Sequence, residues 1–105
     1  MSKSHEIVIE VLNKMTKERM NTREKYNRKL RKLDIKPSFL CYRTSELYYI
    51  LSNDPLIKGN KEAERLIEEC FSFCTRDIFR FIHLDDLKCL IRHHDAYNKW
   101  PVDLI

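Results

Sequence analysis

KEAERLIEECFSFC, residues 61–74, carries the clearest pattern in the chain. At helical spacing its apolar side chains fall within roughly 160° of arc, and its charged side chains fill the other side. The apolar set is Ala63, Leu66, Ile67, Cys70, Phe71, Phe73 and Cys74. We therefore expect an amphipathic helix over 61–74, with neighbouring helices covering its apolar face.

The composition favours an all-α protein. The chain has 105 residues, enough for one domain with one modest core. One glycine and three prolines leave little material for β-turns, and a hydrophobic content of 43% argues against disorder. We predict a single helical domain over 1–105, built as a small bundle of about five or six short helices without appreciable sheet.

Capping residues and helix breakers set the expected boundaries. Ser4 is the predicted cap of the first helix, Thr75 of a short one and Asp85 of the last. A break is expected near 21–22, with one long helix over 4–33 as the alternative. The predicted helices are 4–19, 22–33, 38–52, 61–74, 75–82 and a last one that begins at Asp85. In the last helix, Leu87, Leu90, Ile91 and His94 share a face. Turns are predicted at 52–55 and 59–60.

Positive charge is concentrated at the amino-terminal end. Residues 1–36 hold eleven Lys/Arg against five Asp/Glu, a balance of +6. Residues 37–105 hold nine against eleven, a balance of −2. A basic helical region, here about 4–36, is typical of proteins that bind nucleic acid, an acidic protein surface or anionic lipid.

The densest basic stretch lies at 25–32. Its five cations are Lys25, Arg28, Lys29, Arg31 and Lys32. On a helix they would contact a phosphate backbone, where such contacts give affinity without reading the base sequence. The alternative is a solvated helix face that keeps the protein soluble. Most of these cations have no acidic residue three or four positions away, which supports an external anionic partner, although a solvated face is the commoner role of such a helix.

The tail, about 96–105, is apolar after a proline. Its candidate contact residues are Trp100, Val102, Leu104 and Ile105. They are expected to pack back across the bundle. The alternative is an exposed patch that docks on a partner protein or on a second copy, giving a homodimer.

Cysteines and histidines raise the question of zinc. The candidate ligands are Cys41, Cys70, Cys74, Cys89, His83, His93 and His94. Cys70 and Cys74 lie four apart on one helical face, but that face is apolar and cysteine is among the most frequently buried residues. Buried free thiols are the favoured interpretation, so no metal and no cofactor are predicted.

The sequence carries only fragments of a catalytic site. His93, His94 and Asp95 are residue types of acid–base chemistry, yet neighbouring helix positions point in different directions. At most one of the two histidines can face a given site. A single glycine excludes a glycine-rich phosphate loop. No enzymatic activity is predicted.

These features lead to three functional hypotheses for a protein expected to be intracellular, cytoplasmic or nuclear. No apolar run reaches the roughly 18 residues of a membrane span, and the start lacks a signal-peptide pattern. The first hypothesis is a nucleic-acid-associated binding protein. The second is an adaptor or regulatory protein, including a viral accessory protein, that docks an acidic partner. The third is a zinc-stabilised helical module.

Overall fold

The computed structural model describes residues 2–22, 40–76 and 81–101. In chain order the elements are α1 (Lys3–Thr22), β1 (Cys41–Arg43), α3 (Thr44–Ser52), α4 (Lys61–Arg76), β2 (Phe81–His83) and α5 (Leu84–Tyr97). The protein is mostly helical, which confirms the predicted class in its coarse form. The described ranges hold four helices, fewer than predicted, and a small two-stranded sheet that the sequence does not predict.

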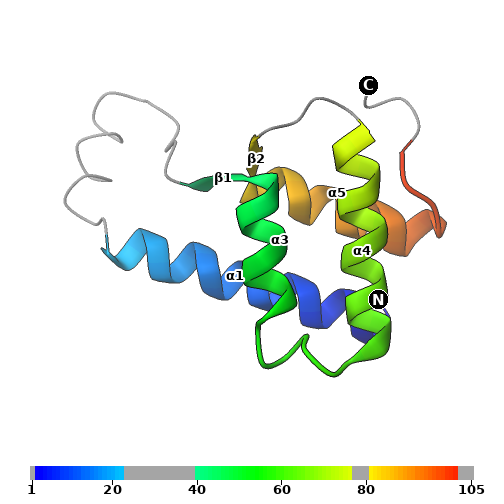
Figure 1. Ribbon diagram of the computed structural model, residues 1–105, viewed down its shortest axis with the longest axis horizontal. Coiled ribbons are helices and arrows are strands. Elements are labelled where there is room, and N and C mark those ends of the chain that lie inside the picture. Colours follow the sequence, from blue (N-terminus) through cyan, green and yellow to red (C-terminus); the bar gives the residue numbers. More distant parts are fainter. Residues whose placement is uncertain (1, 23–39, 77–80, 102–105) are drawn as a thin grey trace.

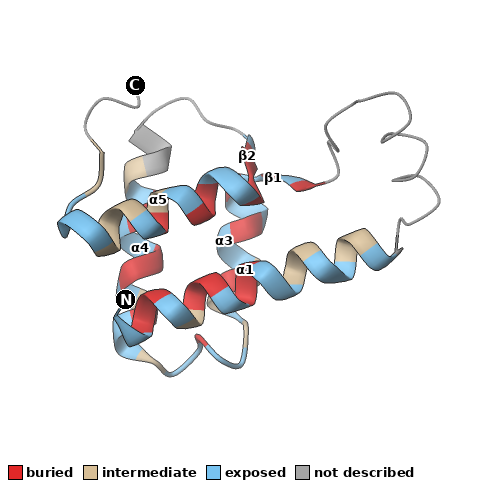
Figure 2. Cartoon of the chain, turned by 180° about the vertical axis from the view of Figure 1, so that it is seen from behind, coloured by how far each residue is buried: buried red, intermediate tan, exposed pale blue. Residues whose placement is uncertain are grey.

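The helices form two crossed pairs (Figure 1). α3 and α4 stand side by side in one pair, and α1 and α5 run side by side across them in the other. α1 also contacts α4, so both pairs share one core. The buried positions of α1 lie in its first half, and its second half extends past the bundle (Figure 2). This agrees with the apolar stripe of α1, which fades after Met15.

The helix predicted over 61–74 is α4, and it supplies the centre of the core. Its buried side chains include Ala63, Leu66, Ile67, Cys70 and Phe71. Burying each large aliphatic side chain contributes about 1.5–3 kcal/mol relative to leaving it exposed. The other helices supply the covering surface with Val8, Val11, Leu12, Leu47, Leu51, Leu84, Leu87 and Ile91.

Two predicted helical ends are strands instead. β1 occupies 41–43 and pairs antiparallel with β2, with Tyr42 opposite Ile82. Both of these residues are buried, and the exposed Cys41 and Arg43 give β1 the alternation of a strand. In β2, Phe81 is exposed, but His83 is buried as well as Ile82. Apolar runs this short do not distinguish helix from strand by their period, and pairing with a distant partner decides between them.

Consequently the helix predicted over 38–52 begins at Thr44, as α3. The prediction of a short helix over 75–82 is wrong as well, because 75–76 belong to α4 and 81–82 to β2. Thr75 lies inside α4, which continues to Arg76, so Thr75 does not begin a new helix.

The starts of α1 and α5 also differ from prediction by two residues. The Ser2 hydroxyl accepts a hydrogen bond from the His5 backbone N–H (3.4 Å), so Ser4 lies within the first turn of α1. At α5 the cap is His83, whose Nδ1 accepts the Asp85 N–H (3.1 Å). Asp85 therefore lies in the first turn of α5, where its negative charge interacts favourably with the positive end of the helix dipole.

The turn predicted at 59–60 is confirmed. Gly59 adopts a left-handed φ of 91°, and the Asn60 side-chain oxygen accepts the Ala63 N–H (3.2 Å) at the start of α4. At the far end of α5, Asn98 takes a φ of 53° and its N–H donates to the His94 carbonyl (2.7 Å). Within the described ranges, no helix has both the length and the apolar character needed to cross a membrane.

Candidate functional site

The five basic residues from Lys25 to Lys32 lie outside the described residues, but the chain before them contacts the chain after them. The Arg19 guanidinium carbon lies 4.3 Å from the centre of the Tyr42 ring. Arg19 belongs to α1, which precedes the basic segment, and Tyr42 belongs to β1, which follows it. A cation–π contact of this kind contributes about 0.5–2 kcal/mol and joins the two flanks of the segment.

Tyr42 is a buried partner in this contact, with 5% of its surface exposed. Burial raises the pKa of its phenol, and the positive charge of Arg19 opposes that rise. The phenol therefore stays neutral at physiological pH, and its ring face is available to the guanidinium.

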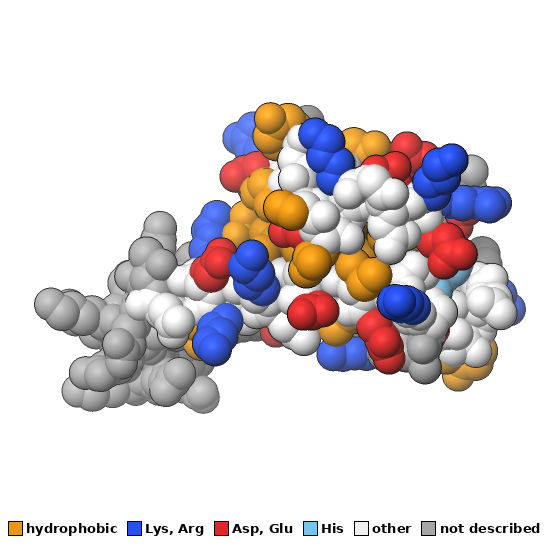
Figure 3. Space-filling model, turned by 90° about the horizontal axis from the view of Figure 1, so that it is seen from below, with side chains coloured by type: hydrophobic (Ala, Val, Ile, Leu, Met, Phe, Trp, Pro, Cys, Tyr) orange, Lys and Arg blue, Asp and Glu red, His pale blue; other side chains and the backbone are white. Residues whose placement is uncertain are grey.

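The described part of α1 is not itself a strongly cationic surface. Its basic residues Lys3, Lys14, Lys17 and Arg19 are balanced by Glu6, Glu10 and Glu18. Viewed from below, Lys/Arg and Asp/Glu side chains are interspersed over the face of the molecule (Figure 3). Interspersed charges of both signs are typical of a solvated surface.

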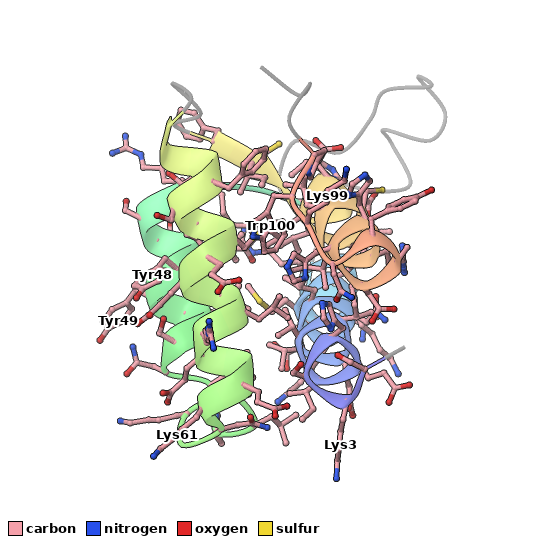
Figure 4. All side chains as sticks on the ribbon, turned by 90° about the vertical axis from the view of Figure 1, so that its right-hand side faces the viewer. Lys3, Tyr48, Tyr49, Lys61, Lys99 and Trp100 are labelled. Atoms are coloured by element: carbon pink, nitrogen blue, oxygen red, sulfur yellow. The ribbon has the colours of Figure 1, made fainter. Side chains whose placement is uncertain are left out.

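Trp100 packs against the bundle. Its ring lies 6.2 Å from Phe73 of α4 and 4.2 Å from His94 of α5, measured between centroids. Figure 4 shows Trp100 between α4 and the end of α5. Trp100 therefore packs back against the bundle, as expected, and does not form an exposed patch. Val102, Leu104 and Ile105 lie outside the described residues.

The cysteines divide into two environments. Cys70 is fully buried on α4, as predicted. Cys41 and Cys89 are exposed, so the prediction that all the thiols are buried is wrong for these two. Each lies on the outward side of its element, Cys41 in β1 and Cys89 in α5. The side chain of Cys74 lies outside the described part.

Thiol labelling of the native protein checks this assignment. A water-soluble alkylating reagent should modify Cys41 and Cys89 quickly and Cys70 at least about 100-fold more slowly, because Cys70 must wait for the core to open. Mass spectrometry of the labelled peptides gives the three rates. Labelling of Cys70 at the rate of Cys89 would show that the apolar face of α4 is not sealed.

His83 and His93 each place their Nδ1 atom against a backbone group of the chain. His83 uses Nδ1 to accept the Asp85 N–H, which places its proton on Nε2. That buried Nε2 has no partner among the described residues. His93 Nδ1 lies 3.2 Å from the Lys99 carbonyl. In the described ranges, no group of three or more His, Cys, Asp or Glu side chains is arranged to hold a metal ion.

Among the described residues, four polar side chains gather where the start of α1 meets the end of α5. We call Ser2, His5, His94 and Asp95 the histidine cluster. His5 Nε2 lies 2.9 Å from His94 Nδ1. Asp95 Oδ1 accepts the Ser2 backbone N–H (2.9 Å) and lies 3.5 Å from His5 Nδ1, which also hydrogen-bonds the Ser2 hydroxyl.

The two rings of the cluster are partly withdrawn from water. His5 is 7% exposed, and its ring lies nearly parallel to that of His94, at 24°, with centroids 5.2 Å apart. Trp100 covers the His94 ring at 4.2 Å. Burial, and then the charge of His5, lower the pKa of His94, whereas Glu69 and Asp95 act in the opposite direction. His94 is therefore neutral at pH 7, and the cluster can hold and exchange protons.

The prediction that only one of His93 and His94 faces a given site is confirmed. His94 faces His5, while His93 lies 4.7 Å from the Tyr97 ring, measured between centroids. The sequence reasoning does not identify His5. Its position in the sequence could have identified it, because His5 lies on the same apolar stripe as Val8 and Leu12. A polar side chain buried on such a stripe requires a partner.

Lys88 is a second buried polar residue that the sequence reasoning does not identify. It is 7% exposed, and its Nζ donates to the Thr16 hydroxyl (3.0 Å) across the α1–α5 contact. Thr16 in turn donates to the Leu12 carbonyl (2.9 Å). Lys88 follows Leu84 by four positions on the buried face of α5, which is the signal that could have identified it.

No family model, no curated protein and no solved structure matches the chain. The activity of a known protein therefore does not transfer to it. Its own residues offer two features of functional interest: the joined flanks of the basic segment and the histidine cluster.

Proposed function

We propose that this protein is a non-enzymatic binding protein that contacts the phosphate backbone of nucleic acids. The contact residues are Lys25, Arg28, Lys29, Arg31 and Lys32. They bind as a group of positive charges and carry no base-sequence preference.

The observation that carries this proposal is where the net charge lies. Residues 23–39 hold seven Lys/Arg and two Asp/Glu, a balance of +5. The other residues hold thirteen and fourteen, a balance of −1, so this one segment accounts for the net charge of +4. A solvated surface needs no such concentration, whereas binding of a polyanion gains from every added cation.

The flanks of the segment support the proposal. The chain enters it from α1 and leaves it into β1, both parts of the folded bundle. The contact between Arg19 and Tyr42 joins these two ends at 4.3 Å. A segment whose ends are fixed loses less conformational entropy on binding than a free tail of the same length.

A protein adaptor is the second candidate, and exposed aromatic residues favour it. Tyr49 is 69% exposed and Tyr97 is 65% exposed, and Figure 4 shows Tyr49 pointing away from the bundle. Aromatic residues are enriched in protein interfaces. In this candidate the basic segment meets an acidic protein surface, and these rings add contact area.

Binding to fluorescently labelled oligonucleotides distinguishes the two candidates. The protein should bind single strands and duplexes of unrelated sequences with Kd values of about 10⁻⁴ to 10⁻⁶ M at physiological salt, and more tightly at low salt. Fluorescence anisotropy measures each Kd. No binding at low salt would exclude the nucleic-acid proposal and make the adaptor the leading function.

A further inference from the structure

The contact between His5 and His94 limits how many protons the two rings can hold together. Each ring has two nitrogens, and one nitrogen from each ring faces the other across the 2.9 Å hydrogen bond. Two neutral imidazoles carry one proton each. One of these protons lies in the hydrogen bond between the rings, and the other lies on an outer nitrogen, either His5 Nδ1 or His94 Nε2.

A single added proton leaves this arrangement intact. It occupies the remaining outer nitrogen, so that both outer nitrogens carry a proton and the hydrogen bond between the rings is kept. On His5 Nδ1 that proton is directed toward Asp95 Oδ1, 3.5 Å away, and the Ser2 hydroxyl. In the singly charged pair both outer nitrogens carry a proton, whichever of the two rings donates in the hydrogen bond between His5 and His94.

A second added proton has no free nitrogen to occupy. It must enter the space between the rings, where two N–H groups and two positive charges would face each other at the present separation of 2.9 Å. The rings must then move apart. The doubly protonated pair is therefore incompatible with the observed contact between α1 and α5 at this end.

We propose that the histidine cluster is a pH-sensitive latch that joins the start of α1 to the end of α5 and opens when both His5 and His94 are protonated. Opening separates Ser2 and His5 from Asp95 and exposes the His94 ring, on which Trp100 lies, to water. Val8 and Leu12, deeper in α1, are fully buried and remain in the core. The opening is therefore confined to one end of the bundle.

Burial and the charges around His94 together set the direction of the pH dependence. His5 on α1 and His93 on α5 disfavour its protonation, whereas Glu69 on α4 and Asp95 on α5 favour it. Burial is the largest influence, and the pKa of His94 in the closed state lies below its ordinary value of 6.5. The open state then binds more protons, so the latch is stable above pH 6.5 and loses stability as pH falls through the lowered pKa.

Trp100 is the only tryptophan of the chain, so its fluorescence reports on the latch directly. The emission of the full chain is followed from about pH 8 to pH 5 in the presence of EDTA, together with the far-ultraviolet helix signal. We expect a shift of the emission to longer wavelength, with a midpoint below 6.5, while the helix signal is retained. An unchanged emission, or a change that coincides with loss of helix, would overturn the proposal.

Three variants identify the groups involved. In His94→Gln and in His5→Gln one titrating ring is missing, so the two-proton state cannot form and the transition should be lost. His93→Gln is the matched control, because His93 neighbours His94 but faces Tyr97, and it should keep the transition. A transition that persists in His94→Gln, or disappears in His93→Gln, contradicts the assignment.

Nuclear magnetic resonance of the parent protein tests the proposal without any substitution. Two of the four histidines should titrate in coupled steps, with the second step displaced to lower pH. Four independent titrations near the ordinary histidine pKa of about 6.5 would overturn the latch even if both variants failed to fold.

Discussion

Replacing Ile67 by alanine is expected to lower the free energy of unfolding by about 2–5 kcal/mol. Ile67 is 1% exposed and lies on α4, which packs against both α3 and α1. The smaller side chain would leave a cavity that the crossed helix pairs cannot close. A small domain is stable by only about 5–15 kcal/mol, so this one change would remove a large part of its stability.

Urea denaturation followed by circular dichroism measures the effect. Glu68→Ala is the matched control, because Glu68 is the next residue of the same helix and is exposed. It should change the unfolding free energy by no more than about 0.5 kcal/mol. An effect of Ile67→Ala below about 0.5 kcal/mol would show that α4 is not the centre of the core.

Nucleic-acid binding by the parent protein is expected to weaken steeply with salt. Each phosphate contact releases condensed counterions, which contributes about −0.9 to the log–log slope on duplex and about −0.7 on single strands. Three to five contacts from the basic segment give an overall slope of about −2 to −4.5. Anisotropy titrations at several salt concentrations give the slope.

The same titrations check the absence of base readout. Oligonucleotides of unrelated sequences but equal length should give the same slope and closely similar Kd values, because phosphate contacts carry no sequence information. A strong preference for one sequence, or a slope close to zero, would require contacts other than these cations.

Local pattern was sufficient to predict the elements with a strong helical period. The stretch 61–74 separates its apolar and charged faces completely, and α4 is observed over Lys61–Arg76. The shared face predicted for the last helix is also present, with Leu87 and Ile91 buried in α5. In both helices the burial imposed by the fold agrees with the period of the sequence.

Local pattern could not predict the two strands. β1 and β2 contain three residues each, and they pair with one another across about forty residues of sequence. The burial pattern of such short strands becomes meaningful only once the pairing is known. The same pairing decides where α3 and α5 begin, which explains why the sequence alone predicts Asp85 as the cap of α5, whereas the observed cap is His83.

The candidate sites were predictable to different degrees. The basic segment is visible as charge alone, without any structure. The histidine cluster depends on two residues that lie 89 positions apart, His5 and His94. A buried histidine within an apolar stripe indicates that a partner exists, but the identity of that partner follows only from how α1 and α5 pack.

We expect that one segment, and not the general charge of the protein, binds nucleic acid. Two triple variants that remove equal charge test it most directly, through the slope of log Kd against log salt concentration. The segment variant combines Arg28→Gln, Arg31→Gln and Lys32→Gln. The control variant removes three exposed cations of the bundle, Lys58→Gln, Lys61→Gln and Arg92→Gln.

The segment variant should flatten the slope by about 0.7–0.9 for each cation that no longer neutralises a phosphate, with the helix signal nearly unchanged. The control variant should keep a slope close to that of the parent, because its cations lie elsewhere on the bundle. If the segment variant retains the parental slope, or if both variants flatten it equally, the basic segment is not the contact surface.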